Sequence, residues 1–520
     1  MTAQHPGGAD PQAAVMALLG DPATHGGAPV ERIDTHANSV FLAGDRAYKL
    51  KRAVRFPFLD FSTLARRLEA CRAELVLNRR TAPDLYLGLG AVVRTAEGRL
   101  RLLDHLPRDE GDLVEPVVRM RRFRQEDLAA HIADAGGLTP PVALALADTV
   151  AAFHEAADPR PDGPGVPEIA HLIAMNTQQL RQHAALFPAE AVTRLDRRGQ
   201  AALDRHGGLI DRRRQAGYVR HCHGDLHLRN IVLVDGRPQP FDCVEFDESL
   251  AVTDVLYDLA YLLMDLEHRR LRPVANLVFN RYLDQTEDLA GLALLPLFLS
   301  IRAGIRAHLT AAGAAVQSDP GQAEALRAEA RAYFDLALAL VQPPRGRLLA
   351  IGGLSGTGKT TLARHLAPEI GPAPGAVILR SDVLRKRLLG CAETDRLPPD
   401  GYAEAVTDRV YAEMDGRAGL VLDGRHAVIC DAVYARTEQR RGIEAVAQAA
   451  GMPFTGLWLV ADQQTQLARV SRRSGDASDA TVEVVRRQAA YDLGEMTWDV
   501  IAASGPAEET VAVARRLCAG

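Results

Sequence analysis

The sequence has little cysteine, little excess charge and no long hydrophobic run. Its six cysteines include no Cys-x-x-Cys pair, which argues against a disulfide framework and for reduced thiols in a cytoplasm. The longest apolar stretch, residues 289–301, contains Pro296 and is too short to span a bilayer. The first residues lack the basic region and apolar run of a signal peptide. We therefore expect a cytoplasmic protein without a membrane partner.

The charge balance argues against a dedicated nucleic-acid-binding protein. The formal net charge is −5, so the chain lacks the basic excess of that class. The basic runs at residues 119–124 and 212–214 are interpreted as solvated helix faces, and we expect no nucleic-acid partner. The composition, 47% hydrophobic and 24% charged, is that of a soluble globular protein and excludes a fibrous or wholly disordered chain.

A change of pattern near residue 342 predicts two domains. Residues 321–341 read as a helix that is stopped by two consecutive prolines, so residues 342–346 are the predicted linker. We expect an N-terminal domain over residues 29–341 and a C-terminal domain over residues 347–520.

The N-terminal domain combines α-helices and β-strands. Residues 1–28 are rich in Gly, Pro and Ala and predict a disordered tail, in which residues 13–19 can form a short helix. Residues 29–120 mix short strands with one helix and predict a small lobe. Residues 121–341 are mostly helical and predict a large lobe, interrupted by a strand-rich segment at residues 220–245.

The C-terminal domain alternates strands with helices. Apolar runs at residues 347–352, 376–380, 419–423 and 454–460 read as buried strands, and helical patterns separate them. Such alternation predicts a parallel α/β sheet.

The most specific motif in the chain is a phosphate loop. Residues 353–360 match G-x-x-x-x-G-K-[ST], and they follow a predicted strand and open a predicted helix. Glycines let backbone N–H groups approach a phosphate, and the helix N-terminus adds partial positive charge. Lys359 is expected on the β- and γ-phosphates, where it is also catalytic, and the Thr360 hydroxyl is expected on Mg²⁺. The motif predicts ATP and Mg²⁺ as cofactors, with the nucleotide bound by Gly353, Ser355, Gly356, Thr357, Gly358, Lys359, Thr360 and Thr361.

Two acids and a group of arginines complete the predicted C-terminal site. Asp423 closes the apolar run 419–423, the position of an outer-sphere Mg²⁺ ligand. Asp382 follows the strand predicted at residues 376–380 and is the candidate base for an acceptor hydroxyl, with a helix N-cap as its alternative role. Arg469, Arg472 and Arg473 are expected to close over the nucleotide, the alternative being a solvated helix face.

Residues 347–520 resemble the small P-loop kinases, the group that holds gluconate kinase, chloramphenicol phosphotransferase, zeta toxins and polynucleotide 5′-kinase. The resemblance rests on the phosphate loop, on Ser381-Asp382-x-x-Arg385, on Leu422-Asp423 and on the arginine-rich segment before residues 476–480. It implies a P-loop NTPase fold and kinase chemistry, but it names no acceptor.

A second phosphotransfer pattern lies in the N-terminal domain. Residues 221–230 read His-Cys-His-Gly-Asp-Leu-His-Leu-Arg-Asn, and a further acid, Asp242, follows a predicted hairpin. An Asp, an Asn five residues later and a second Asp after a hairpin are typical of a catalytic loop with a metal site. Asp225 is the expected catalytic residue that orients or deprotonates the acceptor, and Asn230 and Asp242 are the expected Mg²⁺ ligands.

With these residues, the segment from about residue 30 to 341 resembles the aminoglycoside phosphotransferase and choline kinase branch of the protein-kinase-like fold. The resemblance implies two lobes and a lysine–glutamate ion pair that binds phosphate. Lys49 in Ala-Tyr-Lys is the expected lysine, with Lys51 as the alternative, and Glu74 is the expected partner, with Glu69 as the alternative. Asp258 is expected to brace the catalytic-loop backbone. The chain departs from the family in having no G-x-G-x-x-G loop, so we expect another group, such as Ser39, over the phosphates.

The two patterns together predict a fused chain with two ATP- and Mg²⁺-dependent kinase modules, each acting on a hydroxyl of a small molecule. One alternative is that one module binds nucleotide only to regulate the other. A second is that the P-loop module acts on a nucleotide, a nucleotide-sugar or a nucleic-acid 5′-hydroxyl. The sequence names neither acceptor and does not give the oligomeric state.

Overall fold

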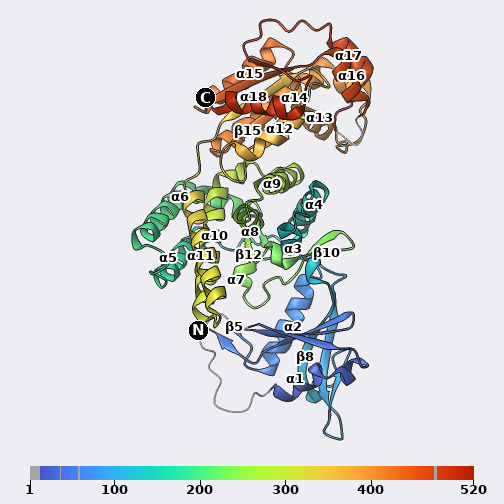
Figure 1. Ribbon diagram of the computed structural model, residues 1–520, viewed down its shortest axis with the longest axis vertical. Coiled ribbons are helices and arrows are strands. Elements are labelled where there is room, and N and C mark those ends of the chain that lie inside the picture. Colours follow the sequence, from blue (N-terminus) through green and yellow to red (C-terminus); the bar gives the residue numbers. More distant parts are fainter. Residues whose placement is uncertain (1–11, 36, 57–58, 473–476, 520) are drawn as a thin grey trace. The chain divides into compact units, whose positions relative to one another are not determined.

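The computed structural model describes residues 12–35, 37–56, 59–472 and 477–519 (Figure 1). The chain forms two compact units. Unit 1 consists of Met1–Glu168 and Asp211–Asp265, and unit 2 of Ile169–Ile210 and Leu266–Gly520. The division does not follow the predicted linker, since helices that we expected in the N-terminal domain belong to the same unit as the C-terminal sheet.

A six-stranded antiparallel sheet forms the small lobe of unit 1, in the order β1-β2-β3-β8-β6-β7. A separate two-stranded sheet joins β4 and β5. The strands of this lobe are β1 (Val30–Asp34), β2 (Asn38–Ala43), β3 (Arg46–Lys51), β4 (Arg55–Phe56), β5 (Leu59–Asp60), β6 (Tyr86–Arg94), β7 (Leu100–Leu103) and β8 (Leu113–Arg121).

Helix α1 (Ala13–Gly20) forms where the sequence indicated a short helix over residues 13–19, within the segment predicted to be a disordered tail. Val15, Met16 and Leu19 are buried against the sheet, and the apolar composition of this short helix explains why it docks. Gln12 is also buried, and its amide nitrogen donates to the Lys51 carbonyl at 2.9 Å. The described part of the predicted tail is therefore folded, and residues 1–11 lie outside the described residues.

Helix α2 (Leu64–Asn78) carries three buried polar residues, Arg67, Glu74 and Asn78. It begins after Thr63, whose hydroxyl caps the first turn by accepting from the Arg66 N–H. Glu74 and Asn78 lie one turn apart on its buried face, and both are fully buried. The short 3₁₀ helices of this lobe are η1 (Pro22–His25), η2 (Glu110–Asp112) and η3 (Gln125–Asp127).

The rest of unit 1 holds the catalytic-loop segment between helices. Two short antiparallel sheets, β10–β11 and β9–β12, occur in and next to the segment predicted to be strand-rich. The elements are α3 (Ala129–Asp134), α4 (Pro140–Ala156), β9 (Val219–His221), η4 (Leu228–Asn230), β10 (Ile231–Val234), β11 (Arg237–Pro240), α7 (Glu248–Ala251), β12 (Val252–Asp254) and α8 (Val255–His268).

The two basic runs are not both solvated helix faces. Arg119 and Arg121 lie in strand β8, so the first run is not helical. The second run ends helix α6 (Ala189–Gln215), but Arg213 is only 3% exposed. It forms two hydrogen bonds with the Asp254 carboxylate, at 2.7 and 2.8 Å, which is why a charged side chain can be buried there.

Unit 2 begins with long helices. They are α5 (Val166–Arg181), most of α6, α9 (Arg272–Thr286), η5 (Ala290–Leu294), α10 (Leu295–Val316) and α11 (Pro320–Leu340). The helical segment Ala290–Val316 extends well beyond the predicted apolar stretch and is long and apolar enough to cross a membrane. However, 72% of its apolar window is buried within the protein, as in the core helix of a soluble protein.

A five-stranded parallel sheet forms the second part of unit 2, in the order β14-β15-β13-β16-β17. Its strands are β13 (Leu348–Gly353), β14 (Val377–Arg380), β15 (Val428–Asp431), β16 (Phe454–Val460) and β17 (Asp499–Ala502). The helices around it are α12 (Lys359–Leu366), η6 (Ala367–Glu369), α13 (Ser381–Leu388), η7 (Pro399–Tyr402), α14 (Glu404–Asp423), α15 (Thr437–Ala449), α16 (Gln463–Ser471), α17 (Val482–Gln488) and α18 (Ala507–Ala519).

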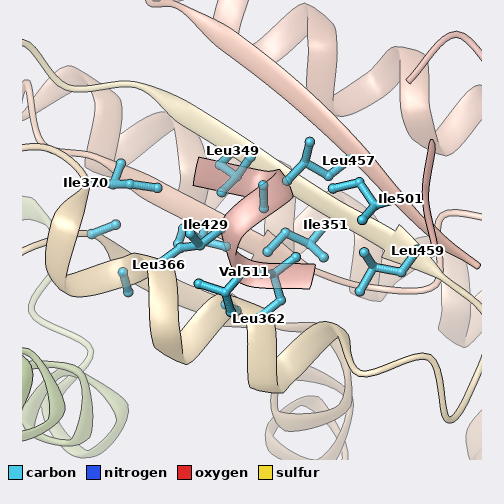
Figure 2. Close-up of a cluster of buried hydrophobic side chains, with 14 of the residues drawn as sticks. Leu349, Ile351, Leu362, Leu366, Ile370, Ile429, Leu457, Leu459, Ile501 and Val511 are labelled. Atoms are coloured by element: carbon cyan, nitrogen blue, oxygen red, sulfur yellow. The ribbon is translucent and has the colours of Figure 1, made fainter. Parts of the chain in front are cut away.

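An apolar core on one face of this sheet fixes the start of helix α12 (Figure 2). Leu349 and Ile351 of β13 pack with Leu362 and Leu366 of α12 and with Val511 of α18. Burial of such side chains stabilises the fold by about 1.5–3 kcal/mol each. The core therefore holds the loop between β13 and α12 in place.

The predicted strand at residues 419–423 is wrong. These residues form the last turns of helix α14, and Asp423 is its exposed last residue. The strand begins five residues later, at Val428, and ends at Asp431. A short apolar run that ends in an acid fits both structures, and burial of Val421 and Leu422 on one helix face explains the misreading.

The six cysteines are free thiols, as predicted. Cys71, Cys222, Cys243 and Cys430 are buried, and burial raises the pKa of each thiol, to about 12 for Cys71. Raised pKa values make these thiols poor nucleophiles.

Candidate active sites

A cluster of two buried lysines and three acids joins the small-lobe sheet to helix α2 and to the segment after β11. Its members are Lys49, Lys51, Glu74, Asp242 and Glu245. Lys49 Nζ donates to Glu74 Oε1 at 2.8 Å and to Asp242 Oδ1 at 2.5 Å. Lys51 Nζ donates to Glu74 Oε2 at 2.8 Å. The residues predicted as an ion pair, Lys49 and Glu74, are thus in contact, and the alternative lysine binds the other oxygen of the same carboxylate. Glu69 takes no part in these contacts.

The protonation states of this cluster follow from its charges. Burial alone would raise the pKa of Glu74, but Lys49 and Lys51 hold it at about 2. Burial alone would lower the pKa of the Lys49 ammonium, but Asp242 and Glu74 hold it well above its ordinary value. Lys49 therefore stays a cation that can bind phosphate oxygens.

Asp225 and Asn230 are hydrogen-bonded to each other, and Asp242 lies nearby, since the N–H of its neighbour Phe241 donates to the Asn230 carbonyl at 2.9 Å. The Asn230 amide nitrogen donates to Asp225 Oδ2 at 2.9 Å and to the Asp225 carbonyl at 3.1 Å, which leaves the amide oxygen as the atom it can offer a cation. Asp242 has a left-handed backbone, with φ 63°, and its side chain is 44% exposed. A non-glycine residue in this conformation is uncommon and is typical of functional sites.

Two buried acids brace the catalytic loop. Asp258 accepts from the backbone N–H groups of Gly224 at 2.9 Å and His223 at 3.2 Å. Asp265, two helical turns further along α8, accepts from the Leu228 N–H at 3.0 Å. Asp258 lies where the family resemblance implied. The i, i+7 spacing of two acids on an otherwise apolar helix was the signal for Asp265, which we missed.

Ser39 does not lie over a phosphate site. It is fully buried, and its hydroxyl donates to Asp34 Oδ1 at 2.7 Å. Glu245 and Asp247 are two further acids of this segment, and each has a hydrogen-bond partner within the protein. Glu245 accepts from Lys51 at 2.5 Å, and Asp247 caps helix α7 through the Ser249 N–H.

The phosphate loop of unit 2 has the backbone that its glycines permit. Gly353, Gly356 and Gly358 have φ values of 143°, 84° and 97°. A Cβ atom on Gly356 would lie 2.7 Å from the Gln466 carbonyl oxygen, so a side chain does not fit there. Helix α12 begins at Lys359, whose ammonium donates to the Leu354 carbonyl at 3.1 Å across the loop. The loop is thus folded around a site for phosphate.

The acid beside Thr360 is Asp431 rather than Asp423. The Thr360 hydroxyl donates to Asp431 Oδ2 at 2.5 Å, at the carboxyl end of β15. This corrects the predicted metal ligand, because Asp423 is at the exposed end of α14. An apolar run, residues 427–430, also directly precedes Asp431, and we did not consider it as a strand.

A cavity of about 1370 Å³ opens over the phosphate loop. It is lined by the loop from Ser355 to Thr361 and by Asp382, Arg469 and Arg472. Arg469 donates to the carbonyls of Gly356 at 3.4 Å and Thr357 at 3.3 Å, so it is placed against the loop as well as the cavity. Arg473 lies outside the described residues.

Asp382 is placed to act as a base. It lies in the first turn of α13, at the carboxyl end of β14, and lines the cavity. Its side chain is not the cap of that helix, which has no side-chain capping bond. Burial, and next the charge of Asp431, raise the pKa of the Asp382 carboxyl above its ordinary value. A raised pKa brings a carboxylate closer to the range in which it accepts protons at neutral pH.

Arg385, Tyr402 and Asp479 also line the cavity. Arg385, only 7% exposed, donates to the carbonyl of Gly401 at 2.9 Å and to the Thr407 hydroxyl at 3.2 Å. Asp479 accepts from the Tyr402 hydroxyl at 2.6 Å and from the Leu397 N–H at 3.0 Å. These polar side chains give the cavity groups that can bind a second substrate beside the nucleotide.

Both sites offer the ligands that Mg²⁺ prefers. In unit 1 they are the carboxylate of Asp242 and the amide oxygen of Asn230, and in unit 2 the hydroxyl of Thr360 beside Asp431. Hard oxygen ligands, few in number and next to a phosphate site, fit a magnesium ion that keeps several waters.

Comparison with known proteins agrees with this geometry. Residues 39–295 match the model of the phosphotransferase enzyme family, and residues 348–492 match a model described as an AAA domain. Uncharacterised proteins of Mycobacterium bovis and Mycobacterium tuberculosis are each 31% identical over 490 residues, which cover 92% of this chain and 93% of the relative. The chain belongs to this family of two-domain proteins. This chain joins a domain of the phosphotransferase enzyme family to a P-loop kinase domain, as the sequence predicted.

Two solved structures match parts of this chain at low sequence identity and low TM-score. The Mycobacterium tuberculosis APS kinase is 19% identical, with a TM-score of 0.27, and the match covers 34% of this chain and 99% of that one. A choline/ethanolamine kinase family protein from Mesorhizobium loti is 16% identical, with a TM-score of 0.39, and the match covers 64% of this chain and 99% of that one. Likenesses at this level do not indicate a substrate.

Proposed function

We propose that this two-domain kinase-family protein has two working active sites, each of which transfers the γ-phosphoryl group of Mg²⁺·ATP to a hydroxyl of a small molecule. One observation carries the proposal. In each unit a candidate base, Asp225 or Asp382, lies in the same site as a phosphate-binding lysine and oxygen ligands for a cation. Phosphoryl transfer requires this combination, because catalysis consists of positioning and charge stabilisation.

In unit 1 separate residues bind phosphate, hold the metal ion and accept the proton. Lys49, fixed by Glu74, binds phosphate oxygens, and Asn230 and Asp242 would hold the magnesium ion that neutralises phosphate charge. Asp225 accepts the proton of the acceptor hydroxyl. Its carboxylate is oriented by the amide of Asn230, so the base and the metal ligand are held in one fixed geometry.

In unit 2 the backbone N–H groups of the phosphate loop and Lys359 bind the β- and γ-phosphates. Thr360 and Asp431 would hold the magnesium ion, and Arg469 places a positive charge beside the loop. Asp382 faces the cavity and accepts the proton of the acceptor hydroxyl. The acceptor then occupies the end of the cavity near Arg385 and Tyr402.

The test is ADP release by the full chain with Mg²⁺·ATP and a panel of aminoglycosides, sugars, amino alcohols and nucleosides. Wild type, Asp225→Asn and Lys359→Met are compared on each compound. We expect acceptors whose turnover is lost in only one of the two variants, which assigns each acceptor to one unit. The Asp423→Asn variant is the matched control, because this acid lies outside both sites.

Other outcomes point to the alternatives. If one variant never loses turnover on any compound, the corresponding unit is a nucleotide-binding regulator rather than a second enzyme. If turnover through the P-loop unit needs a nucleotide or an oligonucleotide 5′-hydroxyl, the small-molecule assignment of that unit is wrong. A cytoplasmic location and the lack of a nucleic-acid partner remain predictions from composition.

A further inference from the structure

Helix α9 lies along the edge of the C-terminal sheet and hydrogen-bonds to strand β14. The Asn280 amide accepts from the Ile378 N–H at 2.7 Å and donates to the Ala376 carbonyl at 3.1 Å. Asn276, only 3% exposed, donates to the same carbonyl at 3.1 Å. Since β14 is an edge strand, these two side chains satisfy backbone groups that another strand would otherwise bind. Helix α9 is therefore part of the folded body that carries the phosphate loop.

Ion pairs join α9 to this body at two places. At the first, Arg281 lies 3.3 Å from Glu393 Oε2, in the loop after α13. At the second, Glu287, directly after α9, lies 2.9 Å from Arg387 and 2.7 Å from Arg417. The first ion pair leads on, through Glu393, to the metal-binding residues.

Glu393 connects Arg281 to the phosphate site. Its other oxygen, Oε1, accepts from Arg380 at 3.3 Å. Arg380 is the last residue of β14, and its Nε lies 3.9 Å from Oδ2 of Asp431. The Arg380 and Asp431 side chains are only 10% and 5% exposed, so water screens their interaction little. Arg380 is thus held between the carboxylate beside Thr360 and a carboxylate that α9 holds in place.

We propose that Arg281 and Glu393 are positioning residues that set the magnesium affinity of the P-loop site by keeping Arg380 from pairing fully with Asp431. A cation that binds Asp431 competes with a metal ion for the same oxygens. Glu393 draws Arg380 away, and Arg281 fixes Glu393. The proposal goes beyond the proposed function and rests on it only in requiring that the P-loop site bind Mg²⁺ with a nucleotide.

The test is binding of a fluorescent ATP analogue to the full chain as Mg²⁺ is titrated. All variants carry Asp242→Asn, which removes a metal ligand of unit 1, and Lys359→Met identifies the signal of the P-loop site. We expect Glu393→Gln to raise the Mg²⁺ concentration for half-maximal binding about fivefold, the change that ~1 kcal/mol between neighbouring charges produces. Arg281→Met should also raise this Mg²⁺ concentration, and Arg281→Lys should keep most of the affinity that Arg281→Met loses.

Arg417→Met is the matched control. It removes an ion pair between the α9 region and the same body, but Arg417 has no contact with Asp431 among the interactions of the described residues. The double variant Glu393→Gln/Arg380→Gln is the second control. Without the Arg380 charge, loss of Glu393 should no longer change the Mg²⁺ dependence.

An equal shift in Glu393→Gln and Arg417→Met would overturn the proposal, because docking of α9 in general would then explain both. An unchanged Mg²⁺ dependence in Glu393→Gln would also overturn it, while Mg²⁺-dependent binding by the Asp242→Asn parent chain would leave the proposed function intact. If the Asp242→Asn parent chain shows no Mg²⁺-dependent binding at the P-loop site, both the proposed function of that site and this proposal are wrong.

Discussion

Lys51 and Glu245 form an ion pair of 2.5 Å in which the two side chains are 0% and 7% exposed. They are 194 residues apart in the sequence. The pair joins strand β3 to the segment three residues after Asp242, whose left-handed backbone needs support from its surroundings. Lys51, the alternative to Lys49 in the sequence analysis, therefore connects the small lobe to the metal-binding segment.

We expect Lys51→Met to destabilise unit 1 by about 3–5 kcal/mol, because it leaves Glu245 buried without its partner. The double variant Lys51→Met/Glu245→Gln should cost less than the two single variants added together. Hydrogen exchange of the β3 amides measures the effect. Arg124→Met, which breaks the exposed pair Arg124–Asp127, is the control and should change exchange little. Additive costs in the double variant would contradict the pairing.

Asp431→Asn should lower kcat/KM of the P-loop site by about 10- to 100-fold, as the loss of a residue that orients a metal ligand does. The cause is the loss of the carboxylate that accepts from Thr360 at 2.5 Å. Asp423→Asn should leave kcat/KM unchanged. The measurement is ADP release in the Asp225→Asn background, so that only the P-loop site turns over. The reverse order of effects would restore Asp423 as the metal-site acid.

The raised pKa of Asp382 gives the P-loop site a pH dependence. A base acts only when ionised, so kcat/KM should fall with a slope of one as pH decreases through the pKa of Asp382, above its ordinary value of 3.8. Asp431→Asn should move this acid limb to lower pH, since the Asp431 charge contributes to the shift. The profile is measured in the Asp225→Asn background, and an acid limb that Asp431→Asn leaves unmoved would contradict this account.

Asp284 on α9 predicts a pH dependence of stability. Burial, and next the charge of Glu393, raise the pKa of this carboxyl to about 6. The folded state then binds a proton at Asp284 more tightly than the unfolded state does. Proton binding at Asp284 therefore stabilises the folded state fully below about pH 4, and this stabilisation is lost as pH rises through 6. Asp284→Asn should therefore be more stable than wild type at pH 8 and gain less at pH 5. Urea unfolding at the two pH values tests this, and an equal effect at both would contradict the shift.

The two lobes, the P-loop sheet and most site residues could be predicted because their signals are local. The backbone of the phosphate loop requires glycines at set positions within residues 353–358. The catalytic loop likewise places Asp225 and Asn230 at a short, fixed spacing. Asp431 could not be separated from Asp423 in this way. Both end short apolar runs, and only the pairing of β15 with β13 and β14 shows which run is a strand.

The sequence also could not predict which charged residues pair with one another. Sequence spacing gave Lys49 and Lys51 the same face of β3, but it could not show that one Glu74 carboxylate binds both. The role of Glu245 depends on a contact with β3 that no local pattern encodes. The helices of residues 266–340 join the unit of the C-terminal sheet through contacts of α9, which the predicted linker gave no reason to expect.

The asparagines of α9 also affect how the chain can be divided. Residues 347–520 expressed alone would expose the Ala376 carbonyl and the Ile378 N–H on an open strand edge, which can pair with another molecule. We expect that fragment to aggregate and a fragment starting near residue 266 to stay in solution. The N-terminal boundary of a soluble C-terminal fragment is therefore set by helix α9, which precedes the linker in the sequence.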